Sequence, residues 1–385
     1  MTTRYRNCSD EPEITVIVPT YNERENIPIL LRKVRDSLSK CCSYEIIIVD
    51  DDSPDGTGVY AEELSKREYP ELYVIIRKGE RGLASAIIEG ARNACGRYIV
   101  VMDADLQHPP EVIPRMYEAA KRLGADLVVA SRYVAGGGVE GWSRIRLLMS
   151  KGASFLAHLL VPETKNVKDV VSGFFLIRRD FLLPRIEQLR PRGYKILLDI
   201  IGRLRPNKII EVPYIFKRRR AGRSKLGLKT LMDYVLHLLE LNQWRIVKNA
   251  IVGVSGIGVL WFILYLLSDI LGLNVLVSYP LAIEASIVNN FIWNDLWVFS
   301  SRRSERGFYV RLAKYHGAVA IGALTNYTTF AILHVLASVE KYLASLLGIL
   351  LGFLANYLFS EHVVWGYKKL QPTEGAKGPR AGILK

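Results

Sequence analysis

The chain has 385 residues, which is enough for two or three domains with buried cores. Half of the residues are hydrophobic and 23% are charged, which excludes a disordered chain, a collagen-like repeat and a small disulfide-stabilised domain. Lysine and arginine number 52 against 38 acidic residues, so the net charge is +14. We expect the four cysteines to be reduced thiols, because they show no CxxC spacing and no nearby histidine pair: Cys8, Cys41, Cys42 and Cys95.

Strand and helix patterns alternate along the first part of the chain. Short runs of β-branched residues predict buried strands at 13–19, 44–49, 72–76, 98–102 and 127–130. Apolar periodicity predicts helices at 26–38, 58–67, 84–94 and 110–123. This alternation indicates an α/β domain with a parallel sheet covered on both faces, and such sheets bind ligands at the carboxyl ends of their strands.

Polar residues with a common chemistry follow four of these strands. Two carboxylates one residue apart, Asp103 and Asp105, can hold Mg²⁺ or Mn²⁺ while phosphate oxygens complete the metal shell. Asp55 is better explained as a turn former or helix cap. The segments are Pro19-Thr20-Tyr21-Asn22-Glu23, Asp50-Asp51-Asp52-Ser53-Pro54-Asp55-Gly56, Asp103-Ala104-Asp105-Leu106-Gln107-His108 and Ser131-Arg132-Tyr133.

An arginine-bearing helix is predicted over about 143–161. Arg146 and Ser150 are four residues apart and share a helix face, and Arg132 ends a neighbouring strand. Two guanidinium groups and a hydroxyl suit a phosphate, whereas the competing explanation is a solvated basic face. This helix and a second one at 229–244 are amphipathic, which predicts that both lie at a membrane surface. Ordinary core packing is the alternative for both.

The stretch 192–229 carries 12 basic residues against 2 acidic ones. A basic stripe can bind nucleic acid. This one lies just before a long apolar region, so we expect anionic lipid headgroups and a lipid phosphate as partners, and no nucleic acid.

The residue composition becomes predominantly apolar after Lys248. Charge-free stretches at 250–268, 315–339 and 342–360, together with 275–299, predict four transmembrane helices. Basic residues lie before the first, between the second and third, and after the fourth, which predicts that both termini and the first domain are cytoplasmic. The start of the chain shows no signal peptide pattern. The sequence therefore predicts a multi-pass protein of the cell membrane.

The membrane half is an internal repeat. A shift of 66 residues matches basic, glycine and asparagine residues that apolar bias does not supply, and this predicts two similar helix hairpins. The predicted domains are 1–228, the interface helix 229–244, the membrane domain 245–368 and a polar tail 369–385. The matched pairs include Arg245 with Arg311, Lys248 with Lys314, Gly256 with Gly322, Asn290 with Asn356, Phe291 with Tyr357 and Val298 with Val364.

Seven segments in order, from residue 13 to about 228, resemble dolichol-phosphate mannose synthases, which are family 2 glycosyltransferases of the Rossmann-like GT-A fold. They are PTYNERENI, EIIIVDDDSPDGT, MDADLQHPPE, SRYV, GWSRIRLLMSKGA, DVVSGFFLIRRD and SKLG. The C-terminal repeat is similar to the GtrA-like membrane domain with four helices in two hairpins. The departures from the family pattern are Asp52, where glycine is usual, and the basic run 217–220.

The resemblance implies roles for individual residues. Donor binding falls to Pro19, Tyr21, Glu23, Val49, Asp51, Asp103, Ala104, Asp105, Arg219 and Lys225; the metal to Asp103, Asp105 and Gln107; the acceptor phosphate to Arg132, Arg146 and Ser150. Asp105, Arg132, Arg219 and Lys225 are the catalytic residues it implies. Asp199, after an amphipathic stretch, is a candidate to orient the sugar.

The implied reaction is metal-dependent, inverting mannosyl transfer from GDP-mannose to dolichyl or polyprenyl phosphate, with no obligatory protein partner. A phosphate monoester is mostly dianionic at pH 7, so it needs no general base. Glucosyl transfer from UDP-glucose to the same acceptor is the close alternative. A membrane translocator or anchor of sugar lipids is the alternative from another class, against which the intact Asp103, Asp105 and Arg132 argue.

Overall fold

The protein is described from a computed structural model that places residues 11–79, 81–190, 195–217, 228–302 and 307–366. Two compact units divide the chain, Met1–Gln243 and Trp244–Lys385. Each unit is described by itself.

A seven-stranded mixed sheet forms the centre of the first unit, in the order β3-β2-β1-β4-β7-β5-β8. A small parallel pair, β6 and β9, stands apart from it. The strands of the large sheet are β1 (Ile14–Thr20), β2 (Tyr44–Asp50), β3 (Leu72–Ile76), β4 (Tyr98–Val101), β5 (Leu127–Ser131), β7 (Phe175–Arg178) and β8 (Ile209–Pro213), and the pair is β6 (Gly138–Val139) and β9 (Ile215–Phe216).

The expectation of a parallel sheet is wrong at β7. This strand lies between β4 and β5 and is antiparallel to both, whereas β1 to β4, and β5 with β8, are parallel. An antiparallel strand begins where its parallel neighbours end. The segment before β7, residues 169–174, therefore lies at the same sheet edge as the loops that follow β1, β2, β4 and β5.

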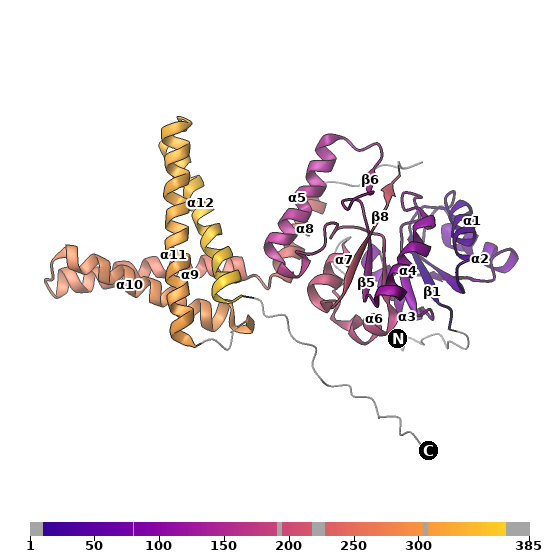
Figure 1. Ribbon diagram of the computed structural model, residues 1–385, viewed down its shortest axis with the longest axis horizontal. Helices are drawn as coiled ribbons and strands as arrows, with labels where there is room; N and C mark the ends of the chain where they lie inside the picture. Colours follow the sequence, from indigo (N-terminus) through magenta and orange to yellow (C-terminus); the bar gives the residue numbers. More distant parts are fainter. Residues whose placement is uncertain (1–10, 80, 191–194, 218–227, 303–306, 367–385) are drawn as a thin grey trace, which may run out of the picture. The chain divides into compact units, whose positions relative to one another are not determined.

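Helices cover both faces of the sheet, as the sequence predicts (Figure 1). Strand residues alternate between the two cores: Tyr98 and Val100 of β4 pack with α1, α2 and α4, and Ile99 and Val101 face α3. Gly90 lets α3 approach closely, because a Cβ there would lie 2.7 Å from Ile17. The helices are α1 (Ile27–Leu38), α2 (Thr57–Arg67), α3 (Leu83–Asn93), α4 (Ile113–Leu123), α6 (Arg179–Leu182) and α7 (Ile196–Asp199).

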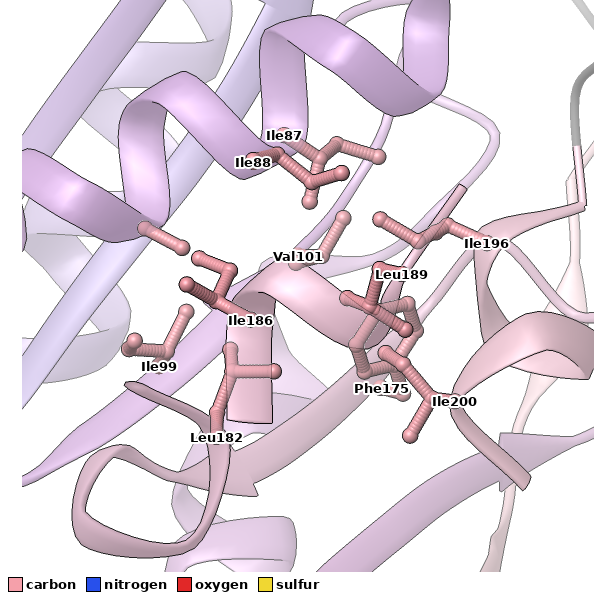
Figure 2. Close-up of a pocket in the computed structure, with 11 residues that line it drawn as sticks. Ile87, Ile88, Ile99, Val101, Phe175, Leu182, Ile186, Leu189, Ile196 and Ile200 are labelled. Atoms are coloured by element: carbon pink, nitrogen blue, oxygen red, sulfur yellow. The ribbon is translucent and has the colours of Figure 1, made fainter. Parts of the chain in front are cut away.

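A small cavity lies in the core on the α3 face, with a volume of about 10 Å³ (Figure 2). Its walls are aliphatic and aromatic side chains from α3, β4, β7 and the segments after β7, such as Ile88, Val101 and Phe175. A water molecule there would find no hydrogen-bond partner among these side chains. The cavity is a packing defect of the core and no ligand site.

The cysteine prediction is wrong in one place. Cys41 and Cys42 are free thiols, whereas the buried Cys95 is disulfide-bonded. Pairing depends on the approach of two Cα atoms in space, which sequence spacing does not reveal.

The two predicted interface helices pack together in the first unit. They are α5 (Arg144–Leu160) and α8 (Leu228–Leu241), and Tyr234 on α8 donates to the backbone oxygen of Ala153 on α5 at 2.6 Å. Ordinary core packing does not explain their outer faces, since Ile145 and Leu148 are each 72% exposed. Further exposed apolar residues on the pair are Met149, Phe155, Leu231 and Met232.

Four long helices form the second unit, and α9 packs on α10 as α11 packs on α12. Each ends in a π-helical turn. Among the described residues, three stretches are long and apolar enough to cross a membrane: Arg245–Ile270, Val275–Val298 and Leu346–Val364. The helices are α9 (Arg245–Tyr265), α10 (Val275–Trp293), α11 (Phe308–Ala331) and α12 (Lys341–Phe359).

The 66-residue repeat has a structural counterpart. A Cβ at Gly256 would lie 2.4 Å from the Asn290 side chain, and a Cβ at the matching Gly322 would lie 2.9 Å from the Cβ of Asn356. In each helix pair, the equivalent glycine therefore leaves space for the equivalent asparagine on the neighbouring helix.

Ion pairs also connect the two repeats. Arg245 pairs with Glu361 at 3.1 Å, and Arg311 pairs with Asp295 at 2.8 Å. Arg245 matches Arg311 and Asp295 matches Glu361 under the shift, so each repeat supplies the arginine for the other's carboxylate. All four residues are buried. Reciprocal ion pairs therefore join the two helix pairs.

Replacing Arg311 should destabilise this unit. Arg311→Met leaves the buried Asp295 carboxylate without its cation, which costs about 3–5 kcal/mol. Adding Asp295→Asn removes that charge and keeps an oxygen for the Trp365 indole N–H, so more than half of the loss should be recovered. Thermal unfolding in detergent measures both, with Lys314→Met as the matched control. Equal midpoints for Arg311→Met and wild type would contradict the ion-pair account.

Candidate active site

Three loops at the carboxyl edge of the sheet contain strained backbone. Asn22 after β1, Asp52 after β2 and Leu106 after β4 have φ of 61°, 52° and 63° without being glycine. Non-glycine residues in this region carry about 1–3 kcal/mol of strain and cluster at functional sites. The left-handed φ at Asp52 also gives a physical reason for the glycine that is usual there in the resembling family.

The first two loops are fixed to each other. Asn22 N–H donates to Ser53 Oγ, and Glu23 N–H donates to Thr57 Oγ1, both at 3.0 Å. Asp55 accepts from the N–H and hydroxyl of Thr57; burial opposes ionisation of Asp55, but these hydrogen bonds outweigh it and lower its pKa. Asp55 therefore stabilises the turn that leads into α2, in agreement with its prediction as a turn former, while Gly56 is the N-cap residue.

The residues expected to hold the donor base meet at this edge. Pro19 and Val49 are register partners on β1 and β2, and both are buried. Tyr21 lies under the guanidinium of Arg81, 5.0 Å from its ring centroid. Asp51 accepts from Arg77 Nε at 2.9 Å, from Arg77 Nη2 and from Gly82 N–H at 2.8 Å. Arg77 thus fixes the Asp51 carboxylate.

The residues expected to hold the metal follow β4. The Asp103 side chain is 38% exposed, whereas Asp105 is buried and accepts from Gln107 N–H at 3.1 Å. The Gln107 side-chain amide donates to the Lys217 carbonyl at 2.9 Å, and Ala104 packs into the core between the two aspartates.

The backbone at Gly173 lies close to Asp103. A Cβ at Gly173 would lie 3.2 Å from His108 Cε1 and 3.4 Å from Asp103 Oδ2, so the absence of a side chain at this position lets the segment before β7 approach the carboxylate. His108 itself is buried against Phe174 and accepts from Asp103 N–H at 3.0 Å. Among the described residues no group of three or more His, Cys, Asp or Glu forms a complete metal cage. Two carboxylates, one of them partly exposed, fit a divalent ion whose remaining ligands come from a substrate.

Arg132 ends β5 in a buried ion pair. Its Nε and Nη2 donate to the two carboxylate oxygens of Asp169 at 2.7 Å each, and its backbone N–H donates to Asp169 at 3.0 Å. Burial alone would lower the Arg132 pKa, but the hydrogen bonds and charge of Asp169 raise it. Arg132 is thus a fixed and already compensated cation.

Arg146 and Ser150 reach Arg132 through two aromatic rings. Trp142 lies under both guanidinium groups, 4.4 Å from Arg146 and 5.2 Å from Arg132. Tyr133 donates to Ser150 Oγ at 2.7 Å, and its ring contacts Arg132 at 5.3 Å. The structure therefore brings the three residues expected at the acceptor phosphate into one cluster, which begins at the N-terminus of α5.

The suggestion that Asp199 orients the sugar is wrong. Its buried carboxylate contacts His237 Nε2 at 2.9 Å, Arg203 Nε at 2.7 Å and Arg190 N–H at 2.9 Å. His237 belongs to α8, so Asp199 anchors that helix to the first unit. Arg219 and Lys225, expected at the donor diphosphate, lie outside the described residues.

Several residues of the site escape sequence reasoning. Asp169 and Gly173 lie in the segment DVVSGFF, where nothing in the letters shows which strand end the segment reaches. Arg77 follows β3, a strand without an acidic cluster behind it. The sequence could point to these residues only through their position next to a strand, and using that position requires knowing the order of the strands in the sheet.

The comparisons with known proteins agree with this geometry. A "Glycosyl transferase family 2" model matches residues 15–183, and a "GtrA/DPMS, transmembrane domain" model matches residues 248–365. A dolichol-phosphate mannosyltransferase of Pyrococcus furiosus is 44% identical over 362 residues, which cover 92% of this chain and 99% of the relative. The chain belongs to the dolichol-phosphate mannosyltransferase family. It is a glycosyltransferase with a helical membrane domain, as the resemblance in its sequence implies.

Two further relatives of the family support this. A dolichol-phosphate mannosyltransferase of Mycosarcoma maydis is 35% identical, covering 69% of this chain and 90% of its own. A polyprenol monophosphomannose synthase of Mycolicibacterium smegmatis is also 35% identical, covering 58% and 85%.

A more distant match is glucosyl-3-phosphoglycerate synthase of Mycobacterium tuberculosis, solved with Mn²⁺ and UDP. It has a TM-score of 0.45 and 23% identity, and covers 60% of this chain and 80% of that one. It says nothing of the ligands of this chain.

Adding a side chain at Gly173 should weaken ligand binding beside Asp103. Gly173→Ala places a methyl group against the carboxylate, so we expect the affinity for GDP in the presence of Mn²⁺ to fall about tenfold, equal to 1.4 kcal/mol. Isothermal titration calorimetry measures this. Gly138→Ala is the control, since a Cβ there meets no atom within 4 Å. The same affinity in both variants would show that ligand binding does not depend on this close approach.

Proposed function

We propose that the protein transfers mannose from GDP-mannose to dolichyl or polyprenyl phosphate. The observation that carries this is the meeting of two clusters at one sheet edge. The segment before β7 contacts both: Gly173 borders the Asp103 carboxylate, and Asp169 binds Arg132, which contacts the rings that touch Arg146 and Ser150. In this proposal the two clusters hold two phosphate-bearing substrates.

The donor occupies the β1 to β4 side. Pro19, Tyr21, Glu23, Val49 and Asp51 bind its base, with Val49, whose side chain is buried, contributing through its backbone. Asp103, Asp105 and Gln107 would hold Mg²⁺ or Mn²⁺, which would supply a Lewis acid to neutralise the leaving diphosphate. Ala104 keeps the two aspartates correctly spaced, and Arg219 and Lys225 add positive charge at the phosphates.

The acceptor phosphate binds at the start of α5. Ser143 caps this helix by accepting from Arg146 N–H at 3.2 Å, and the positive end of the helix dipole favours an anion. Arg146 and Ser150 contact the phosphate directly. Arg132, already paired with Asp169, holds Trp142 and Tyr133 in place for them.

The chemistry is a direct displacement. A dianionic phosphate oxygen attacks C1 of mannose, the bond from C1 to the donor diphosphate breaks, and GDP leaves with the electron pair. The configuration at C1 is inverted. No proton moves, so the chain supplies positioning and charge neutralisation and no general base.

The membrane parts bring the enzyme to its lipid substrate. The exposed apolar faces of α5 and α8 enter the membrane surface. In this proposal α9 to α12 cross the membrane as four spans in two hairpins; among the described residues, α9, α10 and α12 contain stretches long and apolar enough to do so. Both termini and the first unit are cytoplasmic by the distribution of basic residues. The second unit acts as an anchor.

One assay separates the candidate donors. Purified protein receives labelled GDP-mannose or UDP-glucose with polyprenyl phosphate and Mn²⁺. We expect product from GDP-mannose and at least tenfold less from UDP-glucose, in line with the names of the relatives. Asp105→Ala should abolish transfer in the same assay. Preference for UDP-glucose supports the glucosyl alternative, and no transfer from either donor supports the translocator.

Arg146 provides a test of the acceptor site. Arg146→Ala removes a charge-assisted contact of about 1.5–3 kcal/mol, so KM for polyprenyl phosphate should rise at least tenfold while Kd for GDP stays within twofold. Arg144→Ala, an exposed arginine on the same helix, is the control. A loss of GDP affinity in Arg146→Ala would assign this residue to the donor.

A further inference from the structure

Lys195 lies beside the segment before β7, and neither of the two clusters includes it. It directly precedes α7, and its ammonium donates to the Val171 carbonyl at 3.3 Å. Val171 belongs to the same segment as Asp169, which binds Arg132, and Gly173, which borders Asp103. The ammonium therefore lies against the segment that separates the donor and acceptor clusters.

The charges that act on Lys195 come from both clusters. Burial lowers its pKa most, the Arg132 charge lowers it further, and the charges of Asp103 and Asp169 raise it less. The carboxylate of Asp169 already accepts hydrogen bonds from Nε and Nη2 of Arg132. Lys195 forms no ion pair with any carboxylate in the described part of the chain, so a partly buried ammonium has only one carbonyl as partner.

A partly buried cation with so little compensation is costly to the folded protein. The cost is understandable where a ligand supplies the missing negative charge. An ammonium is also a compact point charge that approaches phosphate oxygens from many directions, unlike the planar guanidinium of Arg132.

We propose that Lys195 contacts the acceptor phosphate at the point where this phosphate meets the donor diphosphate. The proposal rests on the proposed function. A dianionic acceptor and a diphosphate repel each other on approach, and a fixed ammonium between them reduces that repulsion as the bond from the phosphate oxygen to C1 forms and the bond from C1 to the diphosphate breaks. Lys195 keeps its proton throughout and acts as a catalytic residue by direct contact.

The role predicts that Lys195 affects reactions of phosphate acceptors more than reactions of water. Lys195→Met should lower kcat for transfer to polyprenyl phosphate about 100-fold. The slow hydrolysis of GDP-mannose without acceptor should change less than threefold, because water carries no charge. Lys165→Met, an exposed lysine outside the site, is the control. A merely structural role would reduce transfer and hydrolysis together.

A binding measurement keeps the test independent of the reaction. Calorimetry with farnesyl phosphate, in the presence of GDP and Mn²⁺, should show at least tenfold weaker binding to Lys195→Met than to wild type, and GDP affinity should be unchanged. Lys195→Gln serves if the methionine variant unfolds at a lower temperature than wild type.

The outcomes are separable. If wild-type protein transfers no mannose, the proposed function fails, and farnesyl phosphate binding still decides the role of Lys195. If transfer and farnesyl phosphate binding are the same in the variant and wild type, or if transfer and hydrolysis fall in equal proportion, Lys195 does not contact the acceptor phosphate.

Discussion

The ion pair between Arg132 and Asp169 is the interaction on which the rest of the site depends. It ties the end of β5 to the segment that leads into β7, with both side chains buried and both carboxylate oxygens engaged. One side of this pair supports Trp142 and Tyr133, and through them Arg146 and Ser150. The segment that contains Asp169 also contains Gly173, which borders Asp103. Loss of Asp169 would leave a buried guanidinium uncompensated and release both clusters.

This arrangement is possible because β7 runs against its neighbours. A parallel strand at this position would start at the opposite edge of the sheet, and Asp169 and Gly173 would lie far from Asp103. One reversed strand thus adds a fifth segment to an edge that already carries the loops after β1, β2, β4 and β5.

Much of this could be predicted from the sequence because local pattern and fold agree. The strand at 44–50 contains the apolar run 46–49, the strand at 72–76 is apolar throughout, and the sequence of the helix from Arg144 shows its cap, its basic start and its apolar face. The sequence does not predict β7 and β8, since runs of four or five residues give no periodicity. It also does not reveal the role of Asp199, because the partner His237 lies 38 residues away on another helix. The donor residues follow from the family resemblance alone, whereas Asp103 with Asp105 and Arg132 with Arg146 and Ser150 also follow from strand ends and helix spacing; the structure explains their proximity.

The second unit shows the same division between pattern and contact. The 66-residue shift was visible in matched arginines, glycines and asparagines. The exchange of carboxylates between the repeats was not, although Asp295 and Glu361 also match under the shift. Phe299 and Trp365 match as well and stack on each other, with ring centroids 4.4 Å apart. Contacts between equivalent residues indicate an approximate two-fold relation of the helix pairs.

A structure with GDP, Mn²⁺ and a short polyprenyl phosphate tests the central claim most directly. The account predicts an anomalous Mn²⁺ signal within about 2.3 Å of carboxylate oxygens of Asp103 and Asp105. It also predicts that the acceptor phosphate binds between Arg146, Ser150 and Lys195, separated from the Mn²⁺ by residues 169–173. Manganese bound away from this edge, or a lipid phosphate held outside the Arg146 cluster, would contradict the assignment of the two clusters to the two substrates.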